Sequence, residues 1–181
     1  MLVPAASGGV GSLLVQLARL KGARQVIATA GGTAKLDLSL SRGADAAVDY
    51  TNLDWPARVR DVTDGKGVDI IYDTVGGALT AASLQALAPG GEMVFAALGR
   101  YALAASDLEA MIGRNQSLRG FALLPLLSPD ALRASLSELF QMAASGRLQV
   151  AIGGRFPLDQ AGEAHRLLEE RRSTGKVVLV P

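Results

Sequence analysis

The sequence predicts an α/β fold in which a doubly wound parallel sheet of six strands has helices on both faces. Short apolar, β-branched runs alternate with segments of helical periodicity along most of the 181 residues. A glycine-rich stretch, residues 6–11, joins the first expected strand to the first expected helix. Both observations are typical of a Rossmann-type domain.

Composition and charge exclude several classes of protein. With 49% hydrophobic and 19% charged residues, the chain can bury a core and is not a disordered tail. The absence of Cys excludes a disulfide framework and a thiolate metal site. The 18 Lys and Arg nearly balance the 17 Asp and Glu, so charge predicts no nucleic-acid or membrane partner. No apolar run or signal peptide suits membrane insertion or export, and we expect a cytoplasmic protein.

Three strand–helix units are expected before residue 64. Apolar residues spaced i, i+3, i+4, i+7 from Val10 to Leu17 share one helix face, and Gly22 is placed to end that helix. Asp54 and Pro56 are residue types that open a helix. The expected strands are Leu2–Val3, Gln25–Ala30 and Ala46–Val48, and the later helices are Lys35–Arg42 and Asp54–Thr63.

Further units and a short tail follow. Ser128, Pro129 and Asp130 supply an N-cap, a first-turn proline and a first-turn acid for a helix that runs to about residue 145. The other expected helices are Leu79–Leu87, Ser106–Ile112 and Asp159–Arg171. The expected strands are Val68–Tyr72, Glu92–Leu98, Ser117–Phe121, Gly154–Leu158 and Lys176–Val180. We therefore expect a dinucleotide-binding domain over 1–152, with 153–181 too short to form a domain.

The turn at residues 6–11 follows the pattern A-x-G-x-x-G, which lacks the first glycine of G-x-G-x-x-G. In that motif the second glycine, here Gly8, lets the backbone approach a pyrophosphate, and the third, here Gly11, lets helix and strand pack closely. The helix N-terminus also favours an anion. An ordinary strand-to-helix turn is the alternative, but the flanking strands and amphipathic helix favour dinucleotide binding.

The residue at the end of the second strand favours NADP(H) over NAD(H). An Asp or Glu about 20 residues beyond the glycines binds the ribose 2′-hydroxyl in NAD-dependent domains. Here the matching residue is Ala30, which leaves room for a 2′-phosphate. Lys35 could supply its counter-charge, although a solvated surface lysine is the alternative interpretation.

Several segments together resemble a known family. They are AASGGVGSLLVQLARLKGA, RGAD, VDY, GVDIIYDTVGG, PGG, SLRGF and RRSTGKVVLVP, with Lys35 between the first two. In this order they resemble the zinc-independent quinone oxidoreductase branch of the medium-chain dehydrogenase/reductases, over essentially the whole chain. The resemblance implies the strand order 3-2-1-4-5-6 and NADPH bound across the carboxyl ends of the strands.

The resemblance also implies roles for particular residues. The pyrophosphate would contact Gly8, Gly9, Val10 and Gly11. The 2′-phosphate end would be surrounded by Gly31, Lys35 and Tyr50. The adenine would lie by Thr74, Val75 and Gly76. The nicotinamide would be lined by Ala97, Leu98, Phe121, Ala122 and Leu123. Arg171 would close over the phosphates, with Lys176 a second candidate for that role.

The chain departs from this family in one respect. Members carry a catalytic, GroES-like domain ahead of the dinucleotide domain, whereas this chain begins inside the first strand of the latter. Residues 153–181 resemble the segment that packs on that catalytic domain. The implied function is an NADPH-dependent reductase of quinones or activated enones. A non-catalytic NADP(H)-binding module, a truncated half-enzyme and an enoyl-reductase fragment are the alternatives.

Other catalytic arrangements are not supported. The sequence has no Tyr-x-x-x-Lys, phosphate-loop or G-x-S-x-G motif. His165 is the only His, so the chain has no His-based triad or multi-His metal site, and no catalytic residue can be named. Leu118 and Phe121 lie on an expected edge strand, residues 117–121, where a homodimer could form unless the neighbouring helix covers it.

Overall fold

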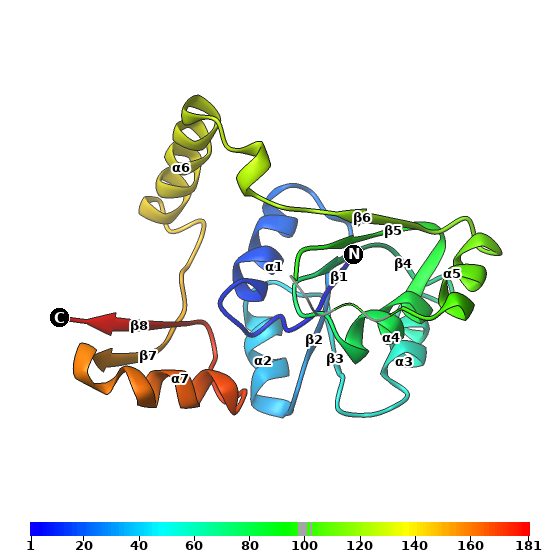
Figure 1. Ribbon diagram of the computed structural model, residues 1–181, viewed down its shortest axis with the longest axis horizontal. Helices are drawn as coiled ribbons and strands as arrows, with labels where there is room; N and C mark the ends of the chain where they lie inside the picture. Colours follow the sequence, from blue (N-terminus) through cyan, green and yellow to red (C-terminus); the bar gives the residue numbers. More distant parts are fainter. Residues whose placement is uncertain (98–100, 102) are drawn as a thin grey trace.

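Six parallel strands build the main sheet in the order β3-β2-β1-β4-β5-β6 (Figure 1). The arrangement comes from a computed structural model of the chain, which describes residues 1–97, 101 and 103–181. The strands are β1 (Leu2–Val3), β2 (Ile27–Ala30), β3 (Ala46–Asp49), β4 (Val68–Asp73), β5 (Leu87–Phe95) and β6 (Ser117–Gly120). The predicted order is confirmed, and it reverses direction between β1 and β4, where such sheets open a crevice for a ligand.

Two apolar layers bury the faces of this sheet. The helices of the sheet domain are α1 (Gly11–Leu20), α2 (Thr33–Ser41), α3 (Trp55–Asp61), α4 (Ala78–Ala86) and α5 (Ala105–Ile112). Leu2 and Ile27 pack in a core with Trp55, whereas their neighbours Val3 and Ala28 belong to a separate core on the opposite face. This follows from strand geometry, because successive side chains point to opposite faces.

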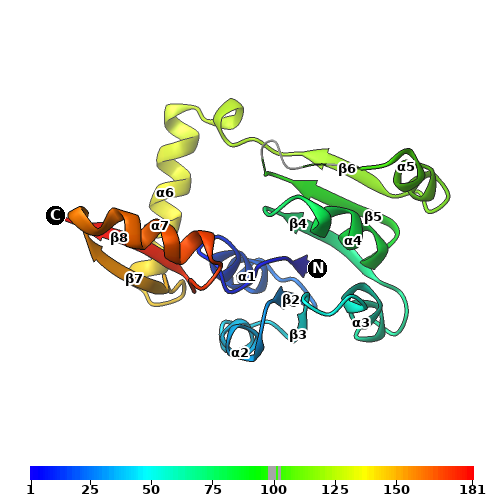
Figure 2. The same ribbon diagram turned by 60° about the horizontal axis from the view of Figure 1, so that its bottom comes forward.

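The remaining elements lie beyond β6. They are the 3₁₀ turn η1 (Leu124–Leu126), α6 (Pro129–Ala144), β7 (Ile152–Pro157), the 3₁₀ turn η2 (Leu158–Gln160), α7 (Ala161–Glu169) and β8 (Lys176–Val180). Strands β7 and β8 form a separate two-stranded parallel sheet, which we call, with α7, the carboxyl-terminal unit (residues 152–180). Figure 2 shows this unit beside α1 and α2, away from the strands β4 to β6.

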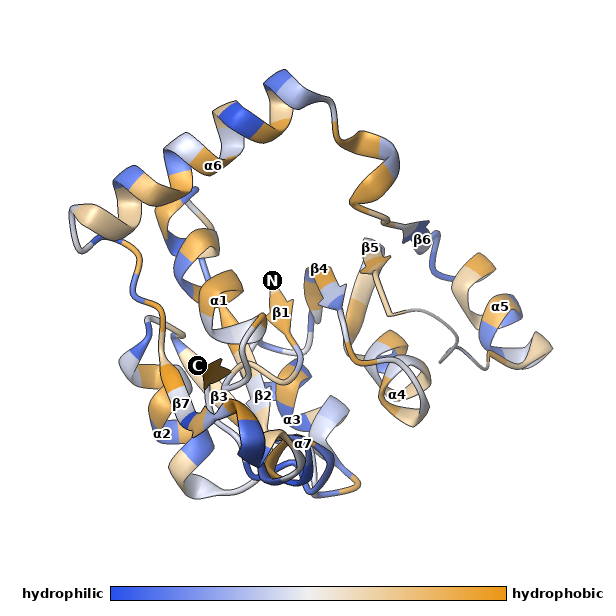
Figure 3. Cartoon of the chain, turned by 60° about the vertical axis from the view of Figure 1, so that its left-hand side comes forward, coloured by the Kyte–Doolittle hydropathy of each residue, from blue (hydrophilic) through white to orange (hydrophobic). Residues whose placement is uncertain are grey.

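Helix α6 begins as the sequence predicts. The Ser128 hydroxyl accepts a hydrogen bond from the Ala131 N–H at 3.2 Å, and Pro129 occupies the first turn. The helix projects from the domain, and of its side chains only that of Met142 is buried. Figure 3 shows apolar residues between β6 and α6, and those of η1 are largely exposed.

Several predicted boundaries are wrong by two residues or more, including the starts of α2, β2, β5 and β7 and the ends of α3 and α7. Strand β5 begins at Leu87 instead of Glu92, because Leu87 pairs with Val68 and the Pro89–Gly91 turn becomes an irregularity within the strand. Strand β2 begins at Ile27, two residues late. Helix α7 ends at Glu169, because Arg171 adopts a left-handed backbone with φ of 55°.

Candidate functional site

The carboxyl ends of the strands bring the predicted cofactor residues to one edge of the sheet. In register, Ala30 pairs with Asp49, Asp73 pairs with Phe95, and Phe95 pairs with Gly120. The predicted residues that follow these strand ends are Gly31, Tyr50, Thr74, Ala97 and Phe121. They therefore share the edge on which open parallel sheets bind ligands.

The glycine turn at residues 8–11 begins helix α1 without a side-chain cap. A methyl group on Gly11 would collide with the carbonyl oxygen of Ala5, so this position needs glycine for helix and strand to approach. Within the described part of the chain, no acceptor is bonded by the backbone N–H groups of Gly9, Val10 or Gly11. Three free donors at the positive end of a helix form a site for an anionic group such as a diphosphate.

The carboxyl-terminal unit covers this glycine turn. The Gly175 N–H donates to the Ser7 carbonyl at 2.7 Å, and Gly8 and Gly175 form an isolated parallel bridge. The stem of Lys176 lies against Gly9, since a Cβ on Gly9 would be 2.8 Å from Lys176 Cδ. Lys176 therefore reaches the same turn as the free N–H groups.

A second cationic position lies at the start of α2. The ammonium of Lys35 donates to the carbonyl of Arg171, the residue with the left-handed backbone. This contact brings together two residues that are 136 positions apart. We call this contact between the Lys35 ammonium and the Arg171 backbone carbonyl the cationic corner; it joins the sheet domain to the carboxyl-terminal unit.

The loops after β2 and β3 meet beside Gly31. A Cβ on Gly31 would lie 3.5 Å from the Tyr50 ring and 3.3 Å from Thr51 Cγ2, so glycine leaves space between these loops. The Asp49 carboxylate accepts from the Gly32 N–H at 3.2 Å and from the Thr51 hydroxyl at 2.7 Å. The bond from the Thr51 hydroxyl is the main reason that the pKa of Asp49 lies below its usual range.

Sequence reasoning missed Asp49, although a signal was present. An Asp followed by Thr two residues later is a typical Asx-turn pattern, in which the carboxylate accepts from the chain just ahead. The Thr51 N–H completes that turn with a 2.9 Å bond to Asp49. Asp49 thereby links the β3 loop to the β2 loop.

The turn after β4 is held by a buried carboxylate. Asp73 has no exposed surface and accepts from the N–H groups of Val75 and Gly76 at 2.8 and 2.9 Å. It also accepts from the Thr80 hydroxyl at 2.5 Å. These bonds fix the predicted adenine-side residues Thr74, Val75 and Gly76 at the carboxyl end of β4.

The turns after β5 and β6 form the predicted nicotinamide end. The Ala97 N–H donates to the Tyr101 hydroxyl at 2.6 Å, and the Tyr101 ring contacts Phe95 edge-on with centroids 4.7 Å apart. Burial raises the pKa of Tyr101. The Phe121 N–H donates to the Phe95 carbonyl at 2.9 Å, and the side chains of Phe121, Ala122 and Leu123 are exposed. The predicted Leu98 lies outside the described residues, and sequence reasoning missed Tyr101.

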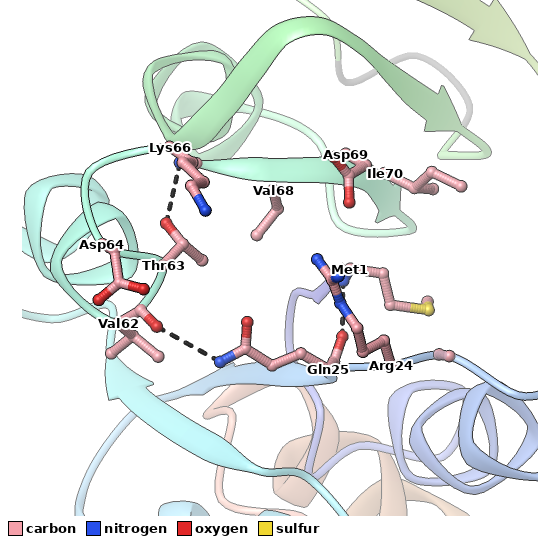
Figure 4. Close-up of a pocket in the computed structure, with 12 residues that line it drawn as sticks. Met1, Arg24, Gln25, Val62, Thr63, Asp64, Lys66, Val68, Asp69 and Ile70 are labelled. Carbon is pink, nitrogen blue, oxygen red and sulfur yellow. Dashed lines mark hydrogen bonds between the residues drawn. The ribbon is translucent and has the colours of Figure 1, made fainter.

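A cavity of about 320 Å³ opens at the opposite, amino edge of the sheet (Figure 4). Several of its polar groups already pair: the Met1 ammonium donates to the Gln25 carbonyl at 2.7 Å, and Gln25 Nε2 donates to the Val62 carbonyl at 3.3 Å. Open parallel sheets bind ligands at the carboxyl edge, at the point where the strand order reverses, here between β1 and β4. We therefore assign the functional site to the carboxyl edge.

Two further observations concern metal binding and membrane-spanning helices. His165 is exposed on α7, and in the parts of the chain with described structure no three His, Cys, Asp or Glu residues gather as a metal site would require. Over the same residues, no helix is both long and apolar enough to cross a membrane.

Comparison with known proteins identifies the family. The sequence model of the zinc-binding dehydrogenase family matches residues 42–179. This chain belongs to the zinc-binding dehydrogenase family. A probable quinone oxidoreductase of Schizosaccharomyces pombe is 36% identical over 181 residues, covering 99% of this chain and 54% of that protein. The resemblance to the quinone oxidoreductase branch of the medium-chain superfamily is thus confirmed.

Solved structures of zinc-binding dehydrogenase relatives share the fold. An Escherichia coli quinone oxidoreductase complexed with NADPH aligns with a TM-score of 0.90 and 31% identity, over 99% of this chain and 56% of that one. An NAD-dependent alcohol dehydrogenase aligns with a TM-score of 0.85 and 37% identity, over 99% of this chain and 50% of that one. The chain therefore spans about half the length of these relatives.

The family description names zinc, but the residues of this chain do not fit a zinc site. Protein zinc sites use Cys, His and carboxylate ligands in sets of three or four. The chain has no Cys, and its single His is the exposed His165. We derive no chemical step through zinc.

Proposed function

We propose that this chain is the dinucleotide-binding part of an NADPH-dependent oxidoreductase. The observation that carries the proposal is that the carboxyl-terminal unit contacts both the glycine turn, with its free backbone donors, and the ammonium of Lys35. The first suits a diphosphate and the second suits an additional phosphate. The NADPH complex of the Escherichia coli relative supports the same cofactor class.

The choice of NADPH over NADH depends on the corner beside β2. Ala30 is buried and places no carboxylate at the end of β2. The carboxylate of Asp49 is engaged by donors of its neighbouring loops. Lys35 retains two further N–H donors beyond the bond to Arg171, since an ammonium carries three. We assign Gly31, Lys35 and Tyr50 to the 2′-phosphate, with Arg171 and Lys176 closing over the phosphates.

When bound, NADPH supplies a hydride from nicotinamide C4, and we propose a quinone or an activated C=C as its acceptor. The residues of this chain bind and orient the cofactor. We assign Thr74, Val75 and Gly76 to the adenine, and Ala97, Phe121, Ala122 and Leu123 to the nicotinamide. No residue of the chain is assigned as an acid or base, and the chain contributes no zinc ligands.

The cofactor assignment is tested by titrating the purified chain with NADPH and NADH. We expect tighter binding of NADPH, and Lys35→Ala should weaken NADPH about tenfold, which is about 1.4 kcal/mol, while changing NADH little. Lys66→Ala, at the amino edge, is the matched control and should change neither. Equal wild-type affinities for both nucleotides would refute the NADPH assignment.

A non-catalytic NADP(H)-binding module is the second candidate, because the chain spans about half of its relatives. We propose that the carboxyl-terminal unit packs on a catalytic, GroES-like domain, which supplies most of the substrate pocket. Turnover of a quinone by this chain with NADPH would support the oxidoreductase. NADPH binding without turnover would favour the binding module, a half-enzyme or an enoyl-reductase fragment.

We also propose a homodimer through the edge strand, residues 117–121. Among the described residues, strand β6 pairs with β5 alone, and the chain after β6 exposes the apolar side chains of Phe121, Leu123 and Leu124. An unpaired strand edge next to apolar surface favours pairing with a second copy. Sedimentation that detects only monomer at high protein concentration would contradict this dimer.

A further inference from the structure

Gln16, on α1, is a buried polar residue that the cofactor assignment does not use. Its side-chain amide pairs with both backbone groups of Gln149. The Gln149 N–H donates to Gln16 Oε1 at 2.8 Å, and Gln16 Nε2 donates to the Gln149 carbonyl at 2.9 Å. This reciprocal pair imitates the bonding of a neighbouring strand and joins positions 133 residues apart.

The side chains of Gln16 and Gln149 each make one further hydrogen bond. The second hydrogen of Gln16 Nε2 is donated to the Ser12 carbonyl at 2.9 Å, in the first turn of α1. The Gln149 side chain accepts from Arg42 Nη1 at 2.6 Å. Gln149 is therefore held by α1 through its backbone and by the end of α2 through its side chain.

Gln149 lies three positions before Ile152, the first residue of the carboxyl-terminal unit. Two residues later, the Ala151 carbonyl accepts from the Lys176 N–H at 2.7 Å. The adjacent Gly175 N–H donates to the Ser7 carbonyl. A continuous path of contacts thus runs from Gln16 through Gln149 and Ala151 to Lys176, and returns to the glycine turn.

We propose that Gln16 is a positioning residue that fixes the carboxyl-terminal unit on α1 and thereby holds Arg171 and Lys176 over the cofactor phosphates. The proposal rests on the proposed function. Gln16 contacts no part of the expected cofactor site and acts through the segment that it holds. It should affect cofactor affinity only while Arg171 and Lys176 are present to be positioned.

The test is the variant Gln16→Met, which keeps an unbranched side chain of similar length and removes the amide. We expect NADPH affinity to fall about five- to tenfold, because the two partly buried bonds to Gln149 are lost. Gln141→Met, on the exposed surface of α6, is the matched control and should change affinity less than twofold.

A merely stabilising role is distinguished by a mutant cycle. In a chain that already carries Arg171→Ala and Lys176→Ala, Gln16→Met should weaken NADPH less than twofold further, since nothing remains to be positioned. A five- to tenfold additional loss in that background would overturn the inference. So would wild-type affinity in the single Gln16→Met variant.

The isosteric variant Gln16→Glu gives an independent measurement. Its carboxylate has no hydrogen to donate to the carbonyls of Ser12 and Gln149, whereas the protonated acid regains one donor. Arg19, Arg42 and Arg147 line the same cavity as Gln16 and favour the charged carboxylate. At neutral pH, Gln16→Glu should therefore weaken NADPH binding about as much as Gln16→Met does. Wild-type affinity in Gln16→Glu would count against the assigned contacts.

Hydrogen exchange without cofactor separates this inference from the proposed function. The amides of Gln149 and Gly175 should exchange faster in Gln16→Met than in wild type, while those of β4 stay protected. If wild type fails to bind NADPH, the proposed function and the positioning role both fail. If wild type binds NADPH but exchange at Gly175 is unchanged in the variant, the positioning role alone fails.

Discussion

At the scale of single residues, some groups of the candidate site can be predicted from the sequence and others cannot. The glycine turn was predictable, because the close approach of backbone to ligand and of helix to strand requires glycine at fixed positions of the motif. Asp49 was missed although its Asx-turn pattern is a local sequence signal. Tyr101 and Gln16 were missed, because their roles depend on hydrogen bonds between side chains and backbone that composition and periodicity do not encode. The pairing of Lys35 with Arg171 likewise depends on how distant segments dock.

The clearest prediction at this scale concerns Ala30. Ala30→Asp places a carboxylate at the end of β2, where it would bind a ribose 2′-hydroxyl and repel a 2′-phosphate. NADPH affinity should fall at least about tenfold, while NADH affinity should rise. Fluorescence titration with both nucleotides measures the change.

Ala30→Asn is the matched control, because it has nearly the same size without the charge. It should lose much less NADPH affinity than Ala30→Asp. Equal losses in the two variants would attribute the effect to crowding at this buried position and would argue against recognition of the 2′-phosphate there.

At the scale of elements, the existence and order of the strands and helices followed from periodicity, but several boundaries did not. The Pro89–Gly91 turn was expected to lie outside β5, and only the pairing of Leu87 with Val68 draws it into the strand. The strands of the carboxyl-terminal unit pair with each other and not with the main sheet. From the sequence alone, these strands could either extend the main sheet or pair with each other, since strand partners depend on long-range packing.

Opposite effects are expected for two glycines in helices. Gly11→Ala would force α1 away from the Ala5 carbonyl and should destabilise the chain by about 1–3 kcal/mol. Gly162→Ala, in α7, has no atom within 4 Å of the new Cβ and should stabilise by about 0.5–1 kcal/mol. Urea denaturation measures both. A neutral Gly11→Ala variant would contradict the close packing of this turn.

At the scale of the whole molecule, the proposed cofactor site draws residues from both the sheet domain and the carboxyl-terminal unit. Bound NADPH should therefore stabilise the chain as a whole. At a concentration one hundred times its Kd, the gain is about 2.7 kcal/mol, and the Tm should rise by roughly 5 to 10 °C. NADH at the same concentration should raise the Tm less. Calorimetry measures both shifts, and an equal rise in Tm with NADH would contradict the preference for NADPH.

The bond between Gly175 and Ser7 has a consequence for biosynthesis. Ser7 leaves the ribosome 168 positions ahead of Gly175, the residue that covers the glycine turn. Contacts between such distant positions form late, because a long loop must close first. A nascent chain can therefore complete the proposed phosphate-binding site only after residues 171–176 have been translated.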